Sequence, residues 1–185
     1  MKLTQLAVAS VFAASILPLS AMADNTGTIN FVGSVVNTPC NIQQSSLKQT
    51  VDFGQLSRNA LESGQIAEAD FDITFTGCNF ADFSETEDEE GNVTKNPVKS
   101  MDIVFTGQNY STDRTLLLTS ANNTNNLGIA IDGFEFGKAE NVLPNGDLGT
   151  EVTLNFKALA KAIDQSKSVA EGQFSAISNF RITYQ

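Results

Sequence analysis

Histidine is absent from this chain of 185 residues. Its absence removes the usual general base, the Ser-His-Asp and Cys-His catalytic arrangements, and the commonest zinc ligand. Hydrolysis by paired carboxylates stays chemically possible because the chain has 21 acidic residues, but these form no recognisable catalytic signature. We therefore expect a protein that is not an enzyme and that holds no cofactor and no metal ion.

Basic residues are also few. The chain has 11 lysines and arginines against 21 acids, which gives a net charge of −10. Proteins that bind phosphate backbones need lysine and arginine to displace the counterions, and an acidic surface repels such a backbone. Nucleic acid and anionic lipid are therefore poor candidates as partners.

The first 23 residues are typical of a secretory signal peptide. Lys2 is followed by an apolar stretch from Leu6 to Leu19 and by small residues at Ala21 and Ala23, which predicts cleavage before Asp24. The apolar stretch is shorter than the roughly 20 residues that span a bilayer, so a membrane anchor is the weaker alternative. We predict an exported protein and no membrane insertion of the mature chain.

Removal of residues 1–23 leaves a mature chain of 162 residues with ten basic and 21 acidic residues, a net charge of −11. A chain of this length can bury one sizeable core, and two domains would be a tight fit. We therefore expect a single domain.

The only two cysteines are Cys40 and Cys78. In an exported protein a disulfide is the natural interpretation, with a reactive thiol or a metal pair as less favoured alternatives. Closing this loop stabilises a fold by about 4 kcal/mol on the chain-entropy estimate.

Strand signals dominate the mature sequence. Segments 71–77 and 101–107 alternate apolar and polar residues and both end in Phe-Thr-Gly, the pattern of half-buried strands. Further short strands are expected, separated by turn-forming clusters, at 115–120, 127–131, 134–136 and 151–159. Asp132-Gly133 predicts a tight hairpin turn. Seven or more short strands indicate an all-β fold, an antiparallel sandwich.

Two segments interrupt this rhythm. Residues 57–66 predict a helix or helical turn, and residues 81–100 carry six acids between Asp82 and Glu90. We interpret 81–100 as an exposed loop or a frayed hairpin extension. A calcium loop is disfavoured, because the alternating acids are long glutamates and the terminal bidentate glutamate is missing.

Both ends of the mature chain have the pattern of a strand. Near the carboxyl end, Phe180, Ile182 and Tyr184 share one face. Near the amino end, the segment 28–36 reads TINFVGSVV, and its apolar row contains a glycine, Gly33. The two ends could simply pair within one domain.

These features together resemble the pilin subunits of chaperone-usher fimbriae, particularly the type 1-like major subunits. The resemblance covers essentially the whole mature chain. It rests on the sequence GTINFVGSVVNTPC at 27–40, VDFGQL at 51–56, the spacing to Cys78, the penultimate Tyr184, and Gly172 at the fourteenth place from the end. The acidic segment 81–100 departs from the family's usual pattern and leaves the outer surface of a filament in question.

The resemblance implies an incomplete immunoglobulin-like sandwich that lacks its last strand. Such a domain has an open groove, which a periplasmic chaperone fills first. At an outer-membrane usher, the amino-terminal extension of another subunit then replaces the chaperone strand, an example of β-strand addition. The implied domains are a donor-strand extension at 24–36 and a pilin domain at 37–185.

Carried over by residue, the resemblance implies two complementary surfaces. The donor strand presents Ile29, Phe31, Gly33 and Val35. The carboxyl-terminal segment that lines the acceptor groove and engages the chaperone contains Gly172, Phe174, Phe180, Ile182 and Tyr184.

The function predicted is a structural subunit that polymerises into an adhesive surface filament, with a main-shaft subunit favoured over a minor one. A tip adhesin needs a further receptor-binding domain. The alternative from another class is a monomeric exported sandwich that binds carbohydrate or another ligand. With no tryptophan, only Tyr110 and Tyr184 supplement phenylalanine as stacking platforms, and this alternative predicts a stable monomer.

Overall fold

The computed structural model describes residues 27–146 and 148–185. The predicted signal peptide lies outside the described residues. Among those residues, none of the helices has the length and apolar character needed to cross a bilayer. The chain divides into two units, one ending at Val35 and the other comprising Val36–Gln185.

The second unit is built mainly of β-strands, with short helical segments between them. The strands are β1 (Asn41–Ile42), β2 (Ala67–Thr76), β3 (Ser84–Glu87), β4 (Val93–Asn96), β5 (Met101–Gly107), β6 (Leu117–Leu118), β7 (Leu127–Ile131), β8 (Ala139–Asn141), β9 (Glu151–Ala162) and β10 (Ser178–Tyr184). The helical segments are α1 (Gln44–Leu47), α2 (Arg58–Glu62) and the 3-10 turn η1 (Ala121–Asn123).

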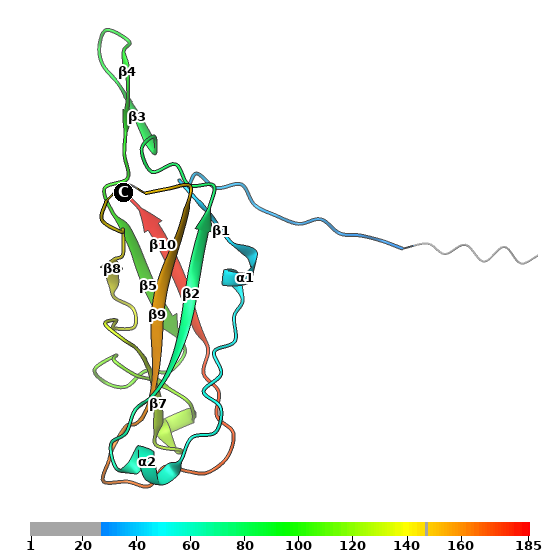
Figure 1. The fold of residues 1–185 in the computed structure, drawn as a ribbon, viewed down its shortest axis with the longest axis vertical. Coiled ribbons are helices and arrows are strands. Elements are labelled where there is room, and N and C mark those ends of the chain that lie inside the picture. Colours follow the sequence, from blue (N-terminus) through cyan, green and yellow to red (C-terminus); the bar gives the residue numbers. More distant parts are fainter. Residues whose placement is uncertain (1–26, 147) are drawn as a thin grey trace, which may run out of the picture. The chain divides into compact units, whose positions relative to one another are not determined.

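The strands form a five-stranded sheet of order β1-β2-β9-β7-β6, a three-stranded sheet of order β10-β5-β8, and the separate hairpin β3-β4. Every strand pairing described is antiparallel. Figure 1 shows the long strands β2 and β9 lying alongside β5 and β10, with the hairpin extending beyond them. The prediction of an antiparallel all-β sandwich is therefore confirmed.

The β2–β9 pair forms one wall of the core. Its inward residues match across the register, with Ile73 opposite Leu154 and Phe75 opposite Val152. All four side chains are buried, whereas the alternate positions of β2 face outward. Period-two alternation thus places one face of this ribbon in the core and the other in solvent.

The facing wall is β5, whose residues Met101, Ile103 and Phe105 are buried. Phe105 makes edge-to-face contacts with Phe71 and Phe156, with ring centroids 6.2 Å and 5.4 Å apart. These rings join the two sheets. Edge-to-face aromatic pairs contribute about 1 kcal/mol each beyond their buried area.

Several predicted elements match the structure closely and others differ in length. The strand predicted at 101–107 coincides with β5, and the strand predicted at 127–131 coincides with β7. The strand predicted at 71–77 begins earlier, at Ala67, because Ala67 and Ala69 pair with Ala160 and Ala158 of β9. The segment at 115–120 contributes only the two residues of β6.

The strand predicted at 134–136 is wrong. The turn at Asp132-Gly133 is present, since the Phe134 amide donates to the Ile131 carbonyl at 3.0 Å, but the ladder stops at this single bridge. Instead, the Phe134 ring contacts Phe105 at 5.2 Å. Packing of this ring into the core takes the chain away from β7.

The helix predicted within 57–66 is present as α2, capped by Ser57, whose side chain accepts a hydrogen bond from the Ala60 amide. The acidic segment forms the β3–β4 hairpin, the second of the two forms anticipated for it. Short elements such as α1 and β8 had no sequence signal.

Candidate functional site

Strand β10 is one edge of the three-stranded sheet, because it pairs only on one side, with β5, among the described residues. Its register places Phe180 opposite Phe105, Ile182 opposite Ile103 and Tyr184 opposite Met101. We call the unpaired side of this strand, from Ser178 to Tyr184, the β10 edge.

The hydrogen-bond pattern shows which backbone groups face away from β5. Ser100 and Gln185 exchange two backbone hydrogen bonds of 3.1 Å. Antiparallel strands alternate between bonded and non-bonded residue pairs, so the N–H and C=O groups of Phe180, Ile182 and Tyr184 point toward the β10 edge. Within residues 27–146 and 148–185, these groups have no hydrogen-bond partner.

The side chains of Phe180, Ile182 and Tyr184 pack against the main core but remain only half-buried. Burial raises the pKa of the Tyr184 phenol to about 12. The site thus combines an apolar row on one face of the strand with unsatisfied backbone groups along its edge. This combination is what an added strand requires.

Gly172 and Phe174 lie before β10 in the coil that leads to it. Gly172 has φ +126°, a conformation that glycine adopts without strain. Phe174 is half-buried and contacts Phe53, with ring centroids 6.2 Å apart. Phe53 belongs to the segment quoted above for the family resemblance, but its contact with Phe174 had no sequence signal because the two residues are far apart in the chain.

The first unit contains the segment predicted as donor strand. Residues 27–36 have no regular secondary structure, so the chain alone does not form the strand that the alternation suggests. Ile29 and Phe31 are 77% and 90% exposed, and Val35 is also exposed. A Cβ built at Gly33 would have no heavy atom within 4 Å. Nothing in the described chain therefore requires glycine at this position.

Comparison with known proteins decides the family. Residues 29–185 match the family model described as Fimbrial protein. The chain belongs to the fimbrial protein family. KS71A fimbrillin of Escherichia coli is 32% identical over 175 residues, which cover 90% of this chain and 88% of the relative.

Solved structures of fimbrial proteins share the fold. A subunit from the structure of a chaperone-usher pilus is 29% identical, with a TM-score of 0.63 over 86% of this chain and 96% of that subunit. The P pilus rod subunit PapA is 28% identical, with a TM-score of 0.60 over 80% of this chain and 100% of PapA.

The expectations of fold class and function are thereby confirmed. This fimbrial protein is an exported, non-enzymatic structural subunit of a surface fimbria, with an incomplete immunoglobulin-like sandwich. As a pilus subunit, it assembles with other pilus subunits.

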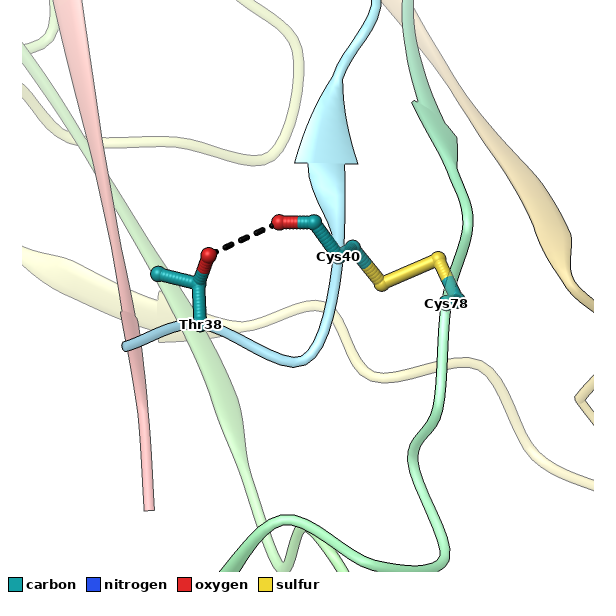
Figure 2. Close-up of a disulfide and its surroundings, with 3 residues drawn as sticks. All are labelled: Thr38, Cys40 and Cys78. Carbon is teal, nitrogen blue, oxygen red and sulfur yellow. Dashed lines mark hydrogen bonds between the residues drawn. A yellow bond between two sulfur atoms is a disulfide. The ribbon is translucent and has the colours of Figure 1, made fainter. Parts of the chain in front are cut away.

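In this fimbrial subunit the two cysteines form the expected disulfide, Cys40–Cys78, which ties the start of β1 to the chain just after β2. Both cysteines are buried. Figure 2 shows Thr38 beside the bridge, its Oγ1 donating to the Cys40 carbonyl at 2.9 Å. The bridge anchors the beginning of the pilin fold.

One acidic residue of the β3–β4 hairpin, Asp88, organises the turn between the two strands. Asp88 accepts hydrogen bonds from the amides of Glu90 and Asn92 and from the Asn92 side chain, which organises the turn. These bonds lower the pKa of Asp88. Among the described residues no cluster of three or more acids, cysteines or histidines is arranged to hold a metal ion.

Proposed function

We propose that this fimbrial protein is a main-shaft subunit that polymerises by donor-strand exchange. In this scheme residues 24–36 of one subunit add a strand to the β10 edge of another copy. The boundary between the donor extension and the pilin domain at 37–185 is part of the proposal. The main observation in its support is an apolar edge strand, β10, whose outward backbone groups have no hydrogen-bond partner among the described residues.

The amino-terminal segment supports the same scheme from the other side. Its alternating row Ile29, Phe31 and Val35 is exposed and would cover apolar surface on a neighbour. Fully burying such a side chain contributes about 2 kcal/mol, so three of them provide a substantial driving force. The backbone of the added strand would satisfy the open N–H and C=O groups of β10.

The scheme also needs protection of the β10 edge before assembly. An exposed apolar edge invites uncontrolled pairing between chains. We therefore propose a periplasmic chaperone that occupies this edge, contacting Phe180, Ile182 and Tyr184, and an outer-membrane usher at which the strand is exchanged. The likeness to a subunit of a chaperone-usher pilus supports this part.

The decisive experiment expresses the mature chain with and without residues 24–36, together with a cognate chaperone. We expect the complete mature chain to form a ladder of polymers on a denaturing gel run without heating, and the truncated chain to form none. A complete chain that remains a stable monomer without any partner would contradict the proposal and favour a monomeric binding domain.

A second variant tests whether the donor strand needs a glycine at position 33. In Gly33→Trp the described part of the chain leaves space for a side chain, because apart from the adjacent residues none of its heavy atoms lies within 4 Å of a Cβ there. We expect this substitution to abolish the ladder while chaperone binding persists, since the indole would prevent close approach of the two backbones. The matched control is Ser34→Trp, which lies on the opposite face of the donor strand. Normal fibres from Gly33→Trp would refute a close approach at this position.

A further inference from the structure

The β3–β4 hairpin is rooted in the core of the domain. Phe80 and Val98, which flank the hairpin, are both buried, and the Val98 amide donates to the Phe80 carbonyl at 2.8 Å. Further out, the Phe83 amide donates to the Asn96 carbonyl at 3.0 Å. The base of the hairpin is therefore held firmly, although most of the residues of β3 and β4 are exposed.

This root also contacts the last residues of β10. The ring of Phe83 lies 6.2 Å from the ring of Tyr184, tilted by 51°, and Phe83 packs against the main core. Just after the hairpin, the amides of Lys99 and Ser100 donate to the carbonyl of Gln185. Figure 1 shows the hairpin rising from the end of the domain toward which the β10 arrow points. Phe83 thus stands where the apolar row of β10 ends.

The proposed donor strand faces a register problem. Moving a strand by two residues keeps the same side chains on the inner face, so alternation alone does not distinguish such registers. The donor row has four positions, at Ile29, Phe31, Gly33 and Val35. The alternate positions of β10 from Ser178 to Tyr184 are also four.

Antiparallel addition with full overlap gives one alignment of these rows. Ile29 would lie opposite Tyr184, and Val35 opposite Ser178. In the same register Gly33 lies opposite Phe180, so the smallest donor residue meets a large aromatic side chain. The donor residue nearest Phe83 is then Ile29.

We propose that the root of the hairpin determines the register and choice of the donor strand, with Phe83 contacting Ile29 of an incoming second copy. This inference rests on the proposed donor-strand exchange and assigns the hairpin to the assembly surface. A donor shifted further along β10 would meet the Phe83 ring, and a donor with a small residue at position 29 would leave that ring uncovered. Phe83 is accordingly a specificity-determining residue.

A crosslinking experiment tests this contact in the full mature chain, in which every subunit both donates and accepts. Ile29→Cys combined with Phe83→Cys should give a ladder that survives heating and collapses on reduction. The control, Val35→Cys combined with Phe83→Cys, should give a ladder that heating removes. Crosslinking of the control pair but not of the first pair, or of neither pair in polymers that do form, overturns the proposal.

A double-mutant cycle provides a second measurement. Phe83→Ala should shorten the lifetime of the unheated ladder in denaturant by roughly 10-fold, as loss of one aromatic contact implies. Combination with Ile29→Ala should be non-additive, whereas combination with Val35→Ala should be additive. Val93→Ala, an exposed change on the same hairpin, should have no effect.

If Phe83→Ala prevents folding, Phe83→Leu replaces it in the cycle, because leucine keeps an apolar side chain at the root. If the effect of the substitution at position 83 on ladder lifetime is additive with the effects of both donor substitutions, Ile29→Ala and Val35→Ala, the register proposal is overturned. Absence of any ladder from the unmodified chain instead contradicts donor-strand exchange itself, so the two failures are distinguishable.

Discussion

The ionisation of the Tyr184 side chain depends on its burial at the end of β10. Its phenol is half-buried, and burial raises its pKa to about 12 from the ordinary value of 10.0. A raised pKa in the folded state means that folding favours the protonated phenol. The corresponding stability is complete below about pH 10 and is lost as the pH rises from 10 toward 12.

We therefore predict an alkaline loss of stability that depends on this residue. In Tyr184→Phe, urea unfolding at about pH 11 should show a smaller loss, relative to about pH 9, than in the unmodified chain. Tyrosinate absorbance should show one group that ionises late and that the substitution removes. An equal alkaline loss in both chains would mean that the Tyr184 phenol is not protected.

For individual residues, the sequence predicted the placement of those side chains whose position depends on local periodicity. Alternation alone placed Phe180, Ile182 and Tyr184 on one face of a strand, and in the structure all three pack on the core. It did not reveal Phe53 and Phe83, since their partners Phe174 and Tyr184 lie about a hundred residues further along the chain. Such long-range contacts depend on the topology, which no short pattern contains.

Among the elements, the β3–β4 hairpin combines a rooted base with an acidic outer part. In the part of the chain that the structure describes, its strands pair only with each other, which leaves both outer edges open. Negative charge on an open edge opposes the addition of further strands. In the proposed exchange, we therefore expect Glu85 and Glu87 on β3 to keep this edge from competing with the β10 edge for donor strands.

The disulfide connects two further elements, β1 and the chain after β2. We predict that reduction, or Cys40→Ser with Cys78→Ser, lowers the free energy of unfolding by about 4 kcal/mol, because the bridge closes a long loop in the unfolded chain. The two cysteines are separated by 38 residues in the sequence. Urea unfolding of the oxidised, reduced and double-serine chains measures this difference.

The reduced chain and the double-serine chain should unfold at the same urea concentration. A fall of less than about 1 kcal/mol would show that the unfolded chain is already compact in this region, so that the bridge constrains little.

Element prediction succeeded where a strand has a clear inner and outer face, as in β5, and failed where tertiary contacts set the ends. The ladder of β2 continues back to Ala67 because β9 is long enough to pair with it. The segment at 134–136 leaves its sheet because Phe134 packs among the core rings. Likewise, segment 28–36 has the pattern of a strand but no partner that makes it one within the described chain.

For the whole molecule, the proposed donor and acceptor are different surfaces of the same chain. A contact between unlike surfaces is heterologous, so each added copy leaves one donor and one acceptor free and the assembly grows without closing. Ending growth therefore requires a subunit that lacks one of these surfaces. This property makes the assembly scheme testable by rearranging the chain rather than by altering its core.

The last prediction uses such a rearrangement. A copy of residues 24–36 joined after Gln185 through a short turn would run antiparallel to β10 and fill its edge from within. If the natural amino-terminal extension is also removed, we expect a monomer that unfolds at higher urea concentration than the chain with an open edge. If the natural extension is kept, the subunit donates but does not accept, so small amounts should shorten the ladder formed by the unmodified chain.

A matched control carries Gly33→Trp in the joined copy, which should neither fill the edge nor shorten the ladder. Long ladders from a subunit whose β10 edge is filled would show that assembly uses another surface.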